Sequence, residues 1–390
     1  MNQMMNVEAP VGVGEVAAPL RGKAVLVTGA SGFIGGRLLE RLLIECGAHP
    51  RVLLRDYSRA ARLARFGLDR VEIVFGSLAD QRALDKGVEG CVAVFHCAYD
   101  AGNPANNVAG VKALVSACLK HRARLIHVST ISIYEPLPDC DLDENTPVPK
   151  KGTAYGKNKL EVEDVVLEAV QDSGLDAVVV MPTIVYGPFS KTWTLAPAKQ
   201  LLSGTVMLPD NGEGLCSAVH VDDVCQVLIR AAVVPQAKGR KYFASGAEPV
   251  TWRRFFEAMA AALDRPGPQA LPRKDLHRQN VHPLSAVKLL LGDPKRIIRW
   301  APTRALAFWA KKNLTPGMKE MVKTVYKHYR RFAPAPVYTP DADRMALYSA
   351  KCRISIDKAR EELGYRPVYD FENGMIDTAR WLQWAMPREG

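Results

Sequence analysis

The chain has 390 residues, of which 48% are apolar and 24% charged, a composition typical of a globular protein with a sizeable core. Its eight cysteines form no Cys-x-x-Cys pair, so neither a metal site nor a disulfide framework is predicted, and a cytoplasmic location is expected. No run of 18 apolar residues occurs, which argues against a membrane-spanning helix.

The net charge of +11 comes from one segment, because residues 271–331 hold 15 lysines and arginines but only three acidic residues. Trp300 and Trp309 lie among these cations. Such a mixture is typical of an amphipathic helix on an anionic membrane surface, here through residues 290–330 of a basic insertion at 270–350. A helical lid whose cations face water explains the pattern equally well. Nucleic-acid binding is disfavoured because no recognition motif accompanies the charge.

The first elements in chain order predict a nucleotide site. Residues 1–20 are expected to be a flexible tail without the features of a signal peptide. An apolar strand at 23–27 then leads through a glycine-rich turn at 28–35 into a helix at 37–43. The glycines of the turn allow a sharp bend and close approach to a pyrophosphate, and the helix N-terminus offers free N–H groups. A plain turn is the competing interpretation.

The second strand, at 51–56, ends in charged residues. In a dinucleotide-binding fold this position meets the adenosine ribose, where a carboxylate favours NAD and an arginine favours the 2′-phosphate of NADP. Arg55 stands near the expected position and Asp56 follows it. The cofactor prediction is therefore NAD(P), leaning towards NADP. Solvated loop charges are the alternative.

Strands and helices continue to alternate along the chain, which predicts an α/β fold with a Rossmann-type doubly wound parallel sheet. Further strands are predicted at 71–76, 91–97, 124–129 and 176–181, and helices at 80–87, 108–120 and 162–173. The NAD(P)-binding domain is expected to span 21–188. A smaller, mostly helical substrate lobe is expected over 189–390, interleaved with the first domain around 215–250.

Two segments carry residues suited to acid–base chemistry. Hydroxyl side chains cluster at 129–134, directly after a strand, where ligands bind in open α/β sheets. Tyr155 and Lys159 open a helix and are four residues apart, so they share one helix face. A phenol with a pKa of about 10 is a poor base at neutral pH. A neighbouring ammonium and an oxidised nicotinamide would lower that pKa and suit Tyr155 to acid–base catalysis.

Taken together, these motifs resemble the extended short-chain dehydrogenase/reductases, the superfamily of the NAD-dependent epimerase/dehydratases. The resemblance covers about residues 22–265 and resumes at 352–370. The run Met-Pro-Thr-Ile-Val-Tyr-Gly-Pro at 181–188 is similar to the family's segment near the nicotinamide. His-Val-Asp-Asp-Val at 220–224 and Leu-Gly-Tyr-Arg-Pro at 363–367 match two further family motifs.

The resemblance implies the site residues. Tyr155 would be the general acid/base, Lys159 would bind the nicotinamide ribose and lower the tyrosine pKa, and Thr130 would hydrogen-bond the substrate oxygen. Ser129 and Ser132 are second choices for that hydroxyl. The predicted cofactor contacts are Gly29, Ser31, Gly32, Phe33, Ile34, Gly35, Arg55, Asp56, Ala98, Lys159, Pro182 and Thr183.

Three further polar residues are expected to be structural. His96 follows a buried strand and is expected to pack against the cofactor loop rather than act as a base. Of Asp222 and Asp223, one is expected to cap the next helix and the other to make structural hydrogen bonds. A catalytic pair of carboxylates is disfavoured.

The sequence also departs from the family. Sugar-nucleotide members present an arginine to the substrate diphosphate before the His-Val-Asp-Asp motif, whereas residues 212–219 contain no basic residue. Gly-Ser-Leu at 76–78 lacks the usual acid near the adenine. These departures favour hydride transfer to or from a secondary alcohol or ketone of an apolar, lipid- or steroid-like substrate, and the enlarged C-terminal region is similar to that of sterol-type dehydrogenases.

Two alternatives remain at this point. One is a nucleotide-sugar epimerase or dehydratase, and the other is a cofactor-sensing binding protein with a vestigial site. Members of the superfamily are often dimers, so a homodimer is an expectation. Association with the cytoplasmic face of a membrane is a further expectation, which would occur through the basic insertion.

Overall fold

The computed structural model describes residues 15–60, 62–67, 70–271 and 336–386. The expected membrane-binding segment at 290–330 lies outside these residues, as do most of the basic insertion and the first 14 residues of the tail. Within the described part, no helix is both long and apolar enough to span a bilayer.

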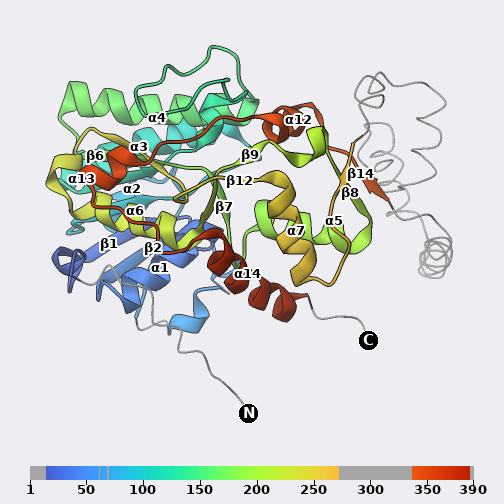
Figure 1. Cartoon of the computed structure of the whole chain (residues 1–390). Helices are drawn as coiled ribbons and strands as arrows, with labels where there is room; N and C mark the ends of the chain where they lie inside the picture. The colour runs from blue at the N-terminus through green and yellow to red at the C-terminus, as the bar shows by residue number, and fades with distance from the viewer. Residues whose placement is uncertain (1–14, 61, 68–69, 272–335, 387–390) are drawn as a thin grey trace, which may run out of the picture.

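Seven parallel strands form the central sheet in the order β11-β6-β5-β4-β1-β2-β3 (Figure 1). They are β1 (Ala24–Thr28), β2 (His49–Leu54), β3 (Glu72–Phe75), β4 (Ala93–His96), β5 (Arg124–Val128), β6 (Ala177–Pro182) and β11 (Lys241–Ala244). Every residue of β4 and β6 is buried, as expected for parallel strands covered on both faces. The order reverses between β1 and β4, so the carboxyl ends of these strands border the crevice where ligands bind in such sheets.

Helices cover both faces of the sheet (Figure 1). On one face α1 (Phe33–Ile44) packs against α6 (Val221–Val233), and on the other α3 (Pro104–His121) lies between α2 (Gln81–Val88) and α4 (Ala154–Ser173). The predicted Rossmann-type sheet is thus confirmed.

Helix α3 begins earlier than the apolar pattern predicted, whereas α4 begins at Ala154, next to the Tyr155 that was expected to open it. Pro104 occupies the first helical position of α3, where its missing N–H costs nothing. At the start of α4, the Thr153 side chain accepts a hydrogen bond from the Gly156 N–H at 3.0 Å. Polar and proline start signals, rather than apolar periodicity, therefore set these boundaries.

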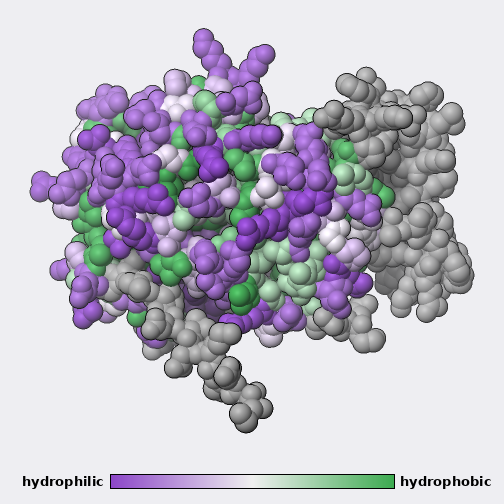
Figure 2. Space-filling view, viewed as in Figure 1, coloured by the Kyte–Doolittle hydropathy of each residue, from purple (hydrophilic) through white to green (hydrophobic). Residues whose placement is uncertain are grey.

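The C-terminal region is mostly helical and has its own aromatic core. Its helices are α5 (Ala196–Ser203), α7 (Trp252–Ala262), α12 (Ala342–Ser349) and α14 (Phe371–Ala385). Its short strands are β7 (Ile184–Tyr186), β8 (Thr205–Leu208), β9 (Leu215–Cys216), β10 (Ala218–His220), β12 (Val250–Thr251), β13 (Gln269–Ala270) and β14 (Val337–Tyr338). The fully buried Trp252 ring lies 4.4 Å from Tyr348 and 5.7 Å from Phe255, which joins α7 to α12. Figure 2 shows apolar side chains gathered over α7 on a face that is otherwise largely hydrophilic.

The paired aspartates are structural, but the expected cap is wrong. His220 caps α6, because its Nδ1 accepts from the Asp222 N–H at 3.4 Å. Asp222 instead accepts from Arg37 Nη2 at 2.8 Å, which ties α6 to α1. Asp223 accepts from the Val368 and Tyr369 N–H groups at 2.8 and 3.1 Å, after α13 (Asp357–Glu362) has returned the chain to the sheet. An imidazole holds the cap position, and the carboxylates occupy the first helical turn, where the helix dipole favours them.

Candidate functional site

Two cavities open at the carboxyl ends of the sheet strands. The smaller has a volume of about 410 Å³ and lies between the glycine turn and the ends of β2, β3 and β4. The larger, of about 810 Å³, extends from the same turn past the end of β5 into the C-terminal lobe. Ser31, Gly32, Cys97 and Tyr99 line both, so the cavities adjoin at the glycine turn.

The glycine turn has no room for side chains. Gly29 has a φ of +72°, and a Cβ there would lie 2.7 Å from the Ala98 nitrogen. A Cβ on Gly35 would lie 2.5 Å from the Gly29 carbonyl oxygen. Glycine is therefore required at both positions by the close backbone packing, and at Gly29 also by the left-handed backbone. The turn leaves the N-terminus of α1 facing the cavities.

The predicted cofactor residues divide between the cavities and their support. Gly29, Ser31, Gly32, Arg55 and Ala98 line the smaller cavity. Ser31, Gly32, Phe33, Ile34, Lys159, Pro182 and Thr183 line the larger one. Gly35 lines neither and packs against the turn, while Asp56 caps the short helix Tyr57–Arg59 by accepting from the Ser58 N–H at 2.9 Å. Arg55, unlike Asp56, therefore borders the smaller cavity.

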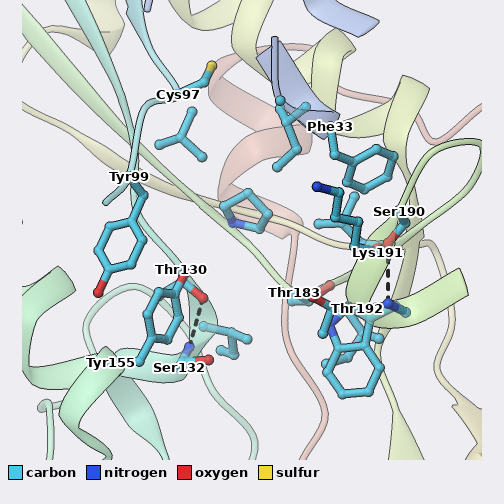
Figure 3. Close-up of a pocket in the computed structure, with 18 of the residues that line it drawn as sticks. Phe33, Cys97, Tyr99, Thr130, Ser132, Tyr155, Thr183, Ser190, Lys191 and Thr192 are labelled. Atoms are coloured by element: carbon cyan, nitrogen blue, oxygen red, sulfur yellow. Dashed lines mark hydrogen bonds between the residues drawn. The ribbon is translucent and has the colours of Figure 1, made fainter. Parts of the chain in front are cut away.

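Three hydroxyl residues lie at the end of β5, and their hydrogen bonds distinguish them. Ser129 donates to Glu163 Oε2 at 2.6 Å, and Ser132 donates to Glu135 Oε1 at 3.0 Å. Thr130 Oγ1 accepts from the Ser132 N–H at 3.2 Å (Figure 3), and Thr130 lies near enough to the Tyr155 hydroxyl to act on its pKa. The hydrogens of both serines are thus committed to carboxylates, whereas the Thr130 hydroxyl donates to no carboxylate among the described residues.

Tyr155 stands in the first turn of α4 with its ring against Tyr99. The two rings are 5.1 Å apart and nearly perpendicular, and both side chains border the larger cavity (Figure 3). The Tyr155 residue keeps 42% of its surface open. Nevertheless the surrounding protein atoms desolvate its hydroxyl and raise the pKa of Tyr155 to about 12, while the Thr130 hydroxyl lowers it.

Lys159 lies one turn further along α4 and is buried. Its ammonium donates to the Val128 carbonyl at 2.6 Å and lies 5.3 Å from the centre of the Tyr99 ring. Burial lowers the pKa of Lys159 to about 8, and the negative charge of the Glu163 carboxylate offsets part of this lowering. Lys159 is not among the groups that shift the Tyr155 pKa. In the protein alone the expected lowering of that pKa by a neighbouring ammonium is therefore not seen, and burial of the hydroxyl is the largest influence on it.

Much of the wall of the larger cavity opposite Thr130 and Tyr155 was not predicted from the sequence. Apolar and aromatic side chains from β7, the following loop and three helices form it: Ile184, Val185, Phe189, Trp193, Leu195, Leu347 and Trp381. Lys191 and Arg344 also border the cavity there. Lys191 could have been found, since it follows the recognised segment at 181–188 by three residues. Nothing in the sequence indicates Arg344 or Trp381, which are distant in the chain.

Two histidines are buried beneath the site. His96 Nδ1 lies 2.8 Å from Thr28 Oγ1, which agrees with the expected packing against the cofactor loop. The His127 ring stacks 5.3 Å away, and neither of its nitrogens has a hydrogen-bond partner among the described residues. Burial and the charge of Lys159 lower the pKa of His96 to about 3 and that of His127 well below its usual value. Both rings are therefore neutral at physiological pH.

This burial predicts acid sensitivity. Below pH 6.5 the unfolded chain binds protons on these histidines that the folded protein does not, so the unfolding free energy should fall as the pH drops from 7 to 5, by about 2 kcal/mol per histidine. Urea denaturation of His127→Leu at the two pH values should therefore show a change in unfolding free energy that is smaller by the contribution of one histidine. The exposed His49→Leu should leave the wild-type pH dependence unchanged. An unaltered dependence in His127→Leu would contradict the prediction.

Known proteins share this sequence and architecture. The model of the NAD dependent epimerase/dehydratase family matches residues 25–243. A 4-hydroxy-2-methyl-3-oxo-4-farnesyl-3,4-dihydroquinoline-1-oxide ketoreductase of Stigmatella aurantiaca is 30% identical over 59% of this chain and 70% of its own length. A 3beta-hydroxysteroid-dehydrogenase/decarboxylase isoform 1 of Arabidopsis thaliana is 26% identical over 90% of this chain and 78% of its own.

Solved structures agree on the fold. A dTDP-glucose 4,6-dehydratase of Streptomyces venezuelae, with NAD and TYD bound, aligns with a TM-score of 0.65 at 20% identity over 93% of this chain and 97% of its own. The shared architecture is the parallel sheet with its flanking helices and C-terminal lobe.

Proposed function

Since the chain belongs to the NAD-dependent epimerase/dehydratase family, we propose that it is a reductase that transfers hydride from NAD(P)H to the carbonyl of an apolar substrate. The observation that carries the proposal is that Thr130 and Tyr155 line the same cavity, whose far wall is largely apolar. The names of two relatives support it, since one is a ketoreductase of a farnesylated ring system and the other a hydroxysteroid dehydrogenase.

Thr130 is the hydroxyl assigned to the substrate oxygen. Ser129 donates to the buried Glu163 and Ser132 to the half-buried Glu135, so using either hydroxyl would leave a carboxylate oxygen without its donor. Thr130 needs no such exchange, because its hydroxyl donates to no carboxylate among the described residues and can donate to a carbonyl oxygen placed beside Tyr155. Such a donor polarises the carbonyl and stabilises the negative charge that develops on its oxygen.

Tyr155 is assigned the proton transfer. With a pKa raised to about 12, its hydroxyl is protonated at neutral pH and suits donation to the oxygen of a carbonyl that is being reduced. The opposite direction would require the phenolate.

The residues at the glycine turn fit a dinucleotide cofactor. Gly29 and Gly35 allow the turn to pack tightly where a Cβ would clash with the backbone, and the N-terminus of α1 favours the pyrophosphate. The glycine turn and Arg55 would hold the nucleotide half, while Lys159, Pro182 and Thr183 would border the nicotinamide half. When bound, a reduced nicotinamide supplies the hydride. The chain's own contribution is to orient the carbonyl, exclude water with the apolar wall and hold the proton on Tyr155.

Arg55 is proposed to select NADP, because a guanidinium pairs strongly with a phosphate. Arg55→Ala should weaken NADPH binding about tenfold or more, a loss of about 1.4 kcal/mol, and leave NADH binding nearly unchanged. Arg55→Lys, which keeps the charge, should recover part of the preference. Fluorescence titration with both cofactors measures this, and equal weakening for the two would exclude Arg55 as the selector.

The assignment itself is tested by turnover. Purified protein should consume NADPH with apolar ketones and produce the corresponding alcohols. Conversion of a UDP- or dTDP-sugar without net cofactor consumption would instead support the epimerase or dehydratase alternative. Cofactor binding with no turnover of either class would favour the binding protein.

A further inference from the structure

We propose that the larger cavity recognises a carboxylate on the substrate through Lys191 and Arg344, so that the substrate is an apolar oxo acid rather than a neutral ketone. The proposal rests on the proposed function and defines its substrate class. Both residues line the same cavity as Thr130 and Tyr155 but belong to the C-terminal lobe. The carbonyl and the carboxylate would therefore be held by different parts of the fold.

Lys191 is held on a rigid backbone. The buried Ser190 donates to the Val185 carbonyl at 3.2 Å and accepts from the Trp193 N–H at 3.3 Å. The buried Thr194 hydroxyl bonds both the N–H and the carbonyl of Gly187, at 3.1 and 3.0 Å. These bonds fix the loop after β7, and in Figure 3 the Lys191 side chain lies on the cavity wall across from Thr130 and Tyr155. The backbone at Lys191 is thus fixed by the fold.

Arg344 is presented by α12 on the same side. Its guanidinium carbon lies 5.2 Å from the centre of the Trp193 ring, and its Nη1 donates to the Tyr348 hydroxyl at 3.1 Å. These contacts use one face and one N–H of a group that has five N–H donors. The remaining donors are available to an anion, and a planar guanidinium matches a carboxylate in geometry.

The four cations of the cavity wall differ in their partners. Lys159 donates to the Val128 carbonyl and Arg62 to the Gly32 carbonyl, the latter at 2.5 Å. For Lys191 and Arg344, no carboxylate lies within ion-pairing distance among the residues that the structure describes. Lys191 is exposed and Arg344 half-buried, so both charges can meet a ligand that enters the cavity.

Two acids on the same wall limit how much negative charge can bind there. Glu135 and Asp343 also line the cavity, and the charge of Arg344 acts on Glu135. These two carboxylates offset part of the charge of Lys191 and Arg344, and they repel a doubly charged diphosphate more strongly than a group with one negative charge. The apolar body of the acid would pack against Trp193, Leu347 and Trp381.

The test compares octanoate with methyl octanoate, which have the same alkyl chain but differ in charge. Calorimetry or the fluorescence of Trp193 and Trp381 measures binding to the full chain. Octanoate should bind at least tenfold more tightly, and Lys191→Met or Arg344→Gln should abolish this preference without changing the affinity for the ester. Lys191→Arg should retain it. Lys199→Met, an exposed lysine on α5 outside the cavity wall, is the matched control.

Equal binding of acid and ester by the wild type would overturn the proposal, as would equal weakening of both by Lys191→Met. A loss of NADPH affinity in Lys191→Met would also overturn it, because Lys191 would then serve the cofactor. Reduction of ketones with no preference for oxo acids over their methyl esters would refute only this inference and leave the reductase standing. Selective octanoate binding without reduction of any ketone would refute the reductase and keep the carboxylate site.

Discussion

Replacing Tyr155 by phenylalanine is expected to lower kcat by about 10²–10⁴-fold, the usual contribution of a positioned general acid. Phenylalanine keeps the ring that packs 5.1 Å from Tyr99 and removes only the hydroxyl beside Thr130. Cofactor affinity should therefore be retained, since the nucleotide cavity lies at the glycine turn and not at Tyr155. Steady-state kinetics with an apolar ketone and a fluorescence titration with NADPH separate the two effects.

Tyr99→Phe is the matched control. It removes a hydroxyl from the neighbouring ring of the same cavity while leaving the Thr130–Tyr155 pair intact. Turnover should stay within a few-fold of the wild type. If Tyr155→Phe retained full activity, or if both variants lost activity alike, the assignment of proton transfer to Tyr155 would fail.

Replacing Gly29 by alanine is expected to abolish cofactor binding and to destabilise the fold. The left-handed backbone at Gly29 costs a residue with a side chain about 1–2 kcal/mol. In addition, the new Cβ would overlap the Ala98 backbone nitrogen at 2.7 Å, and overpacking of this kind costs about 1–3 kcal/mol. Relief of that overlap must shift either the turn or the end of β4, and both border the nucleotide cavity.

Gly90→Ala isolates the backbone contribution. Gly90 has a φ of +71°, nearly equal to that of Gly29, but a Cβ there meets nothing within 4 Å. Urea denaturation should show a loss of about 1–2 kcal/mol for Gly90→Ala and a larger loss for Gly29→Ala. Only Gly29→Ala should lose NADPH affinity. Similar behaviour of the two variants would mean that close packing against Ala98 is not what the turn requires.

Much of the fold could be predicted because it depends on local patterns. The apolar runs, the glycine turn and the alternation of strands with helices are each set by backbone periodicity within a few residues, and the structure contains the predicted parallel sheet. The four-residue spacing of Tyr155 and Lys159 likewise follows from helix geometry, and both line the larger cavity. Even so, the start of α3 at Pro104 depended on a proline start signal that the apolar pattern does not include.

The amino-acid sequence by itself determined the order of the elements, the nucleotide-binding turn and the residue types at the end of β5. Only the tertiary structure decided which of three neighbouring hydroxyls keeps a free hydrogen, because that depends on Glu163 and Glu135 reaching Ser129 and Ser132. It also decided the pKa shifts, since desolvation is a property of packed surroundings and not of neighbours in the chain. Lys191 and Arg344 are 153 positions apart and border one cavity only because two separate elements of the lobe pack around Trp193.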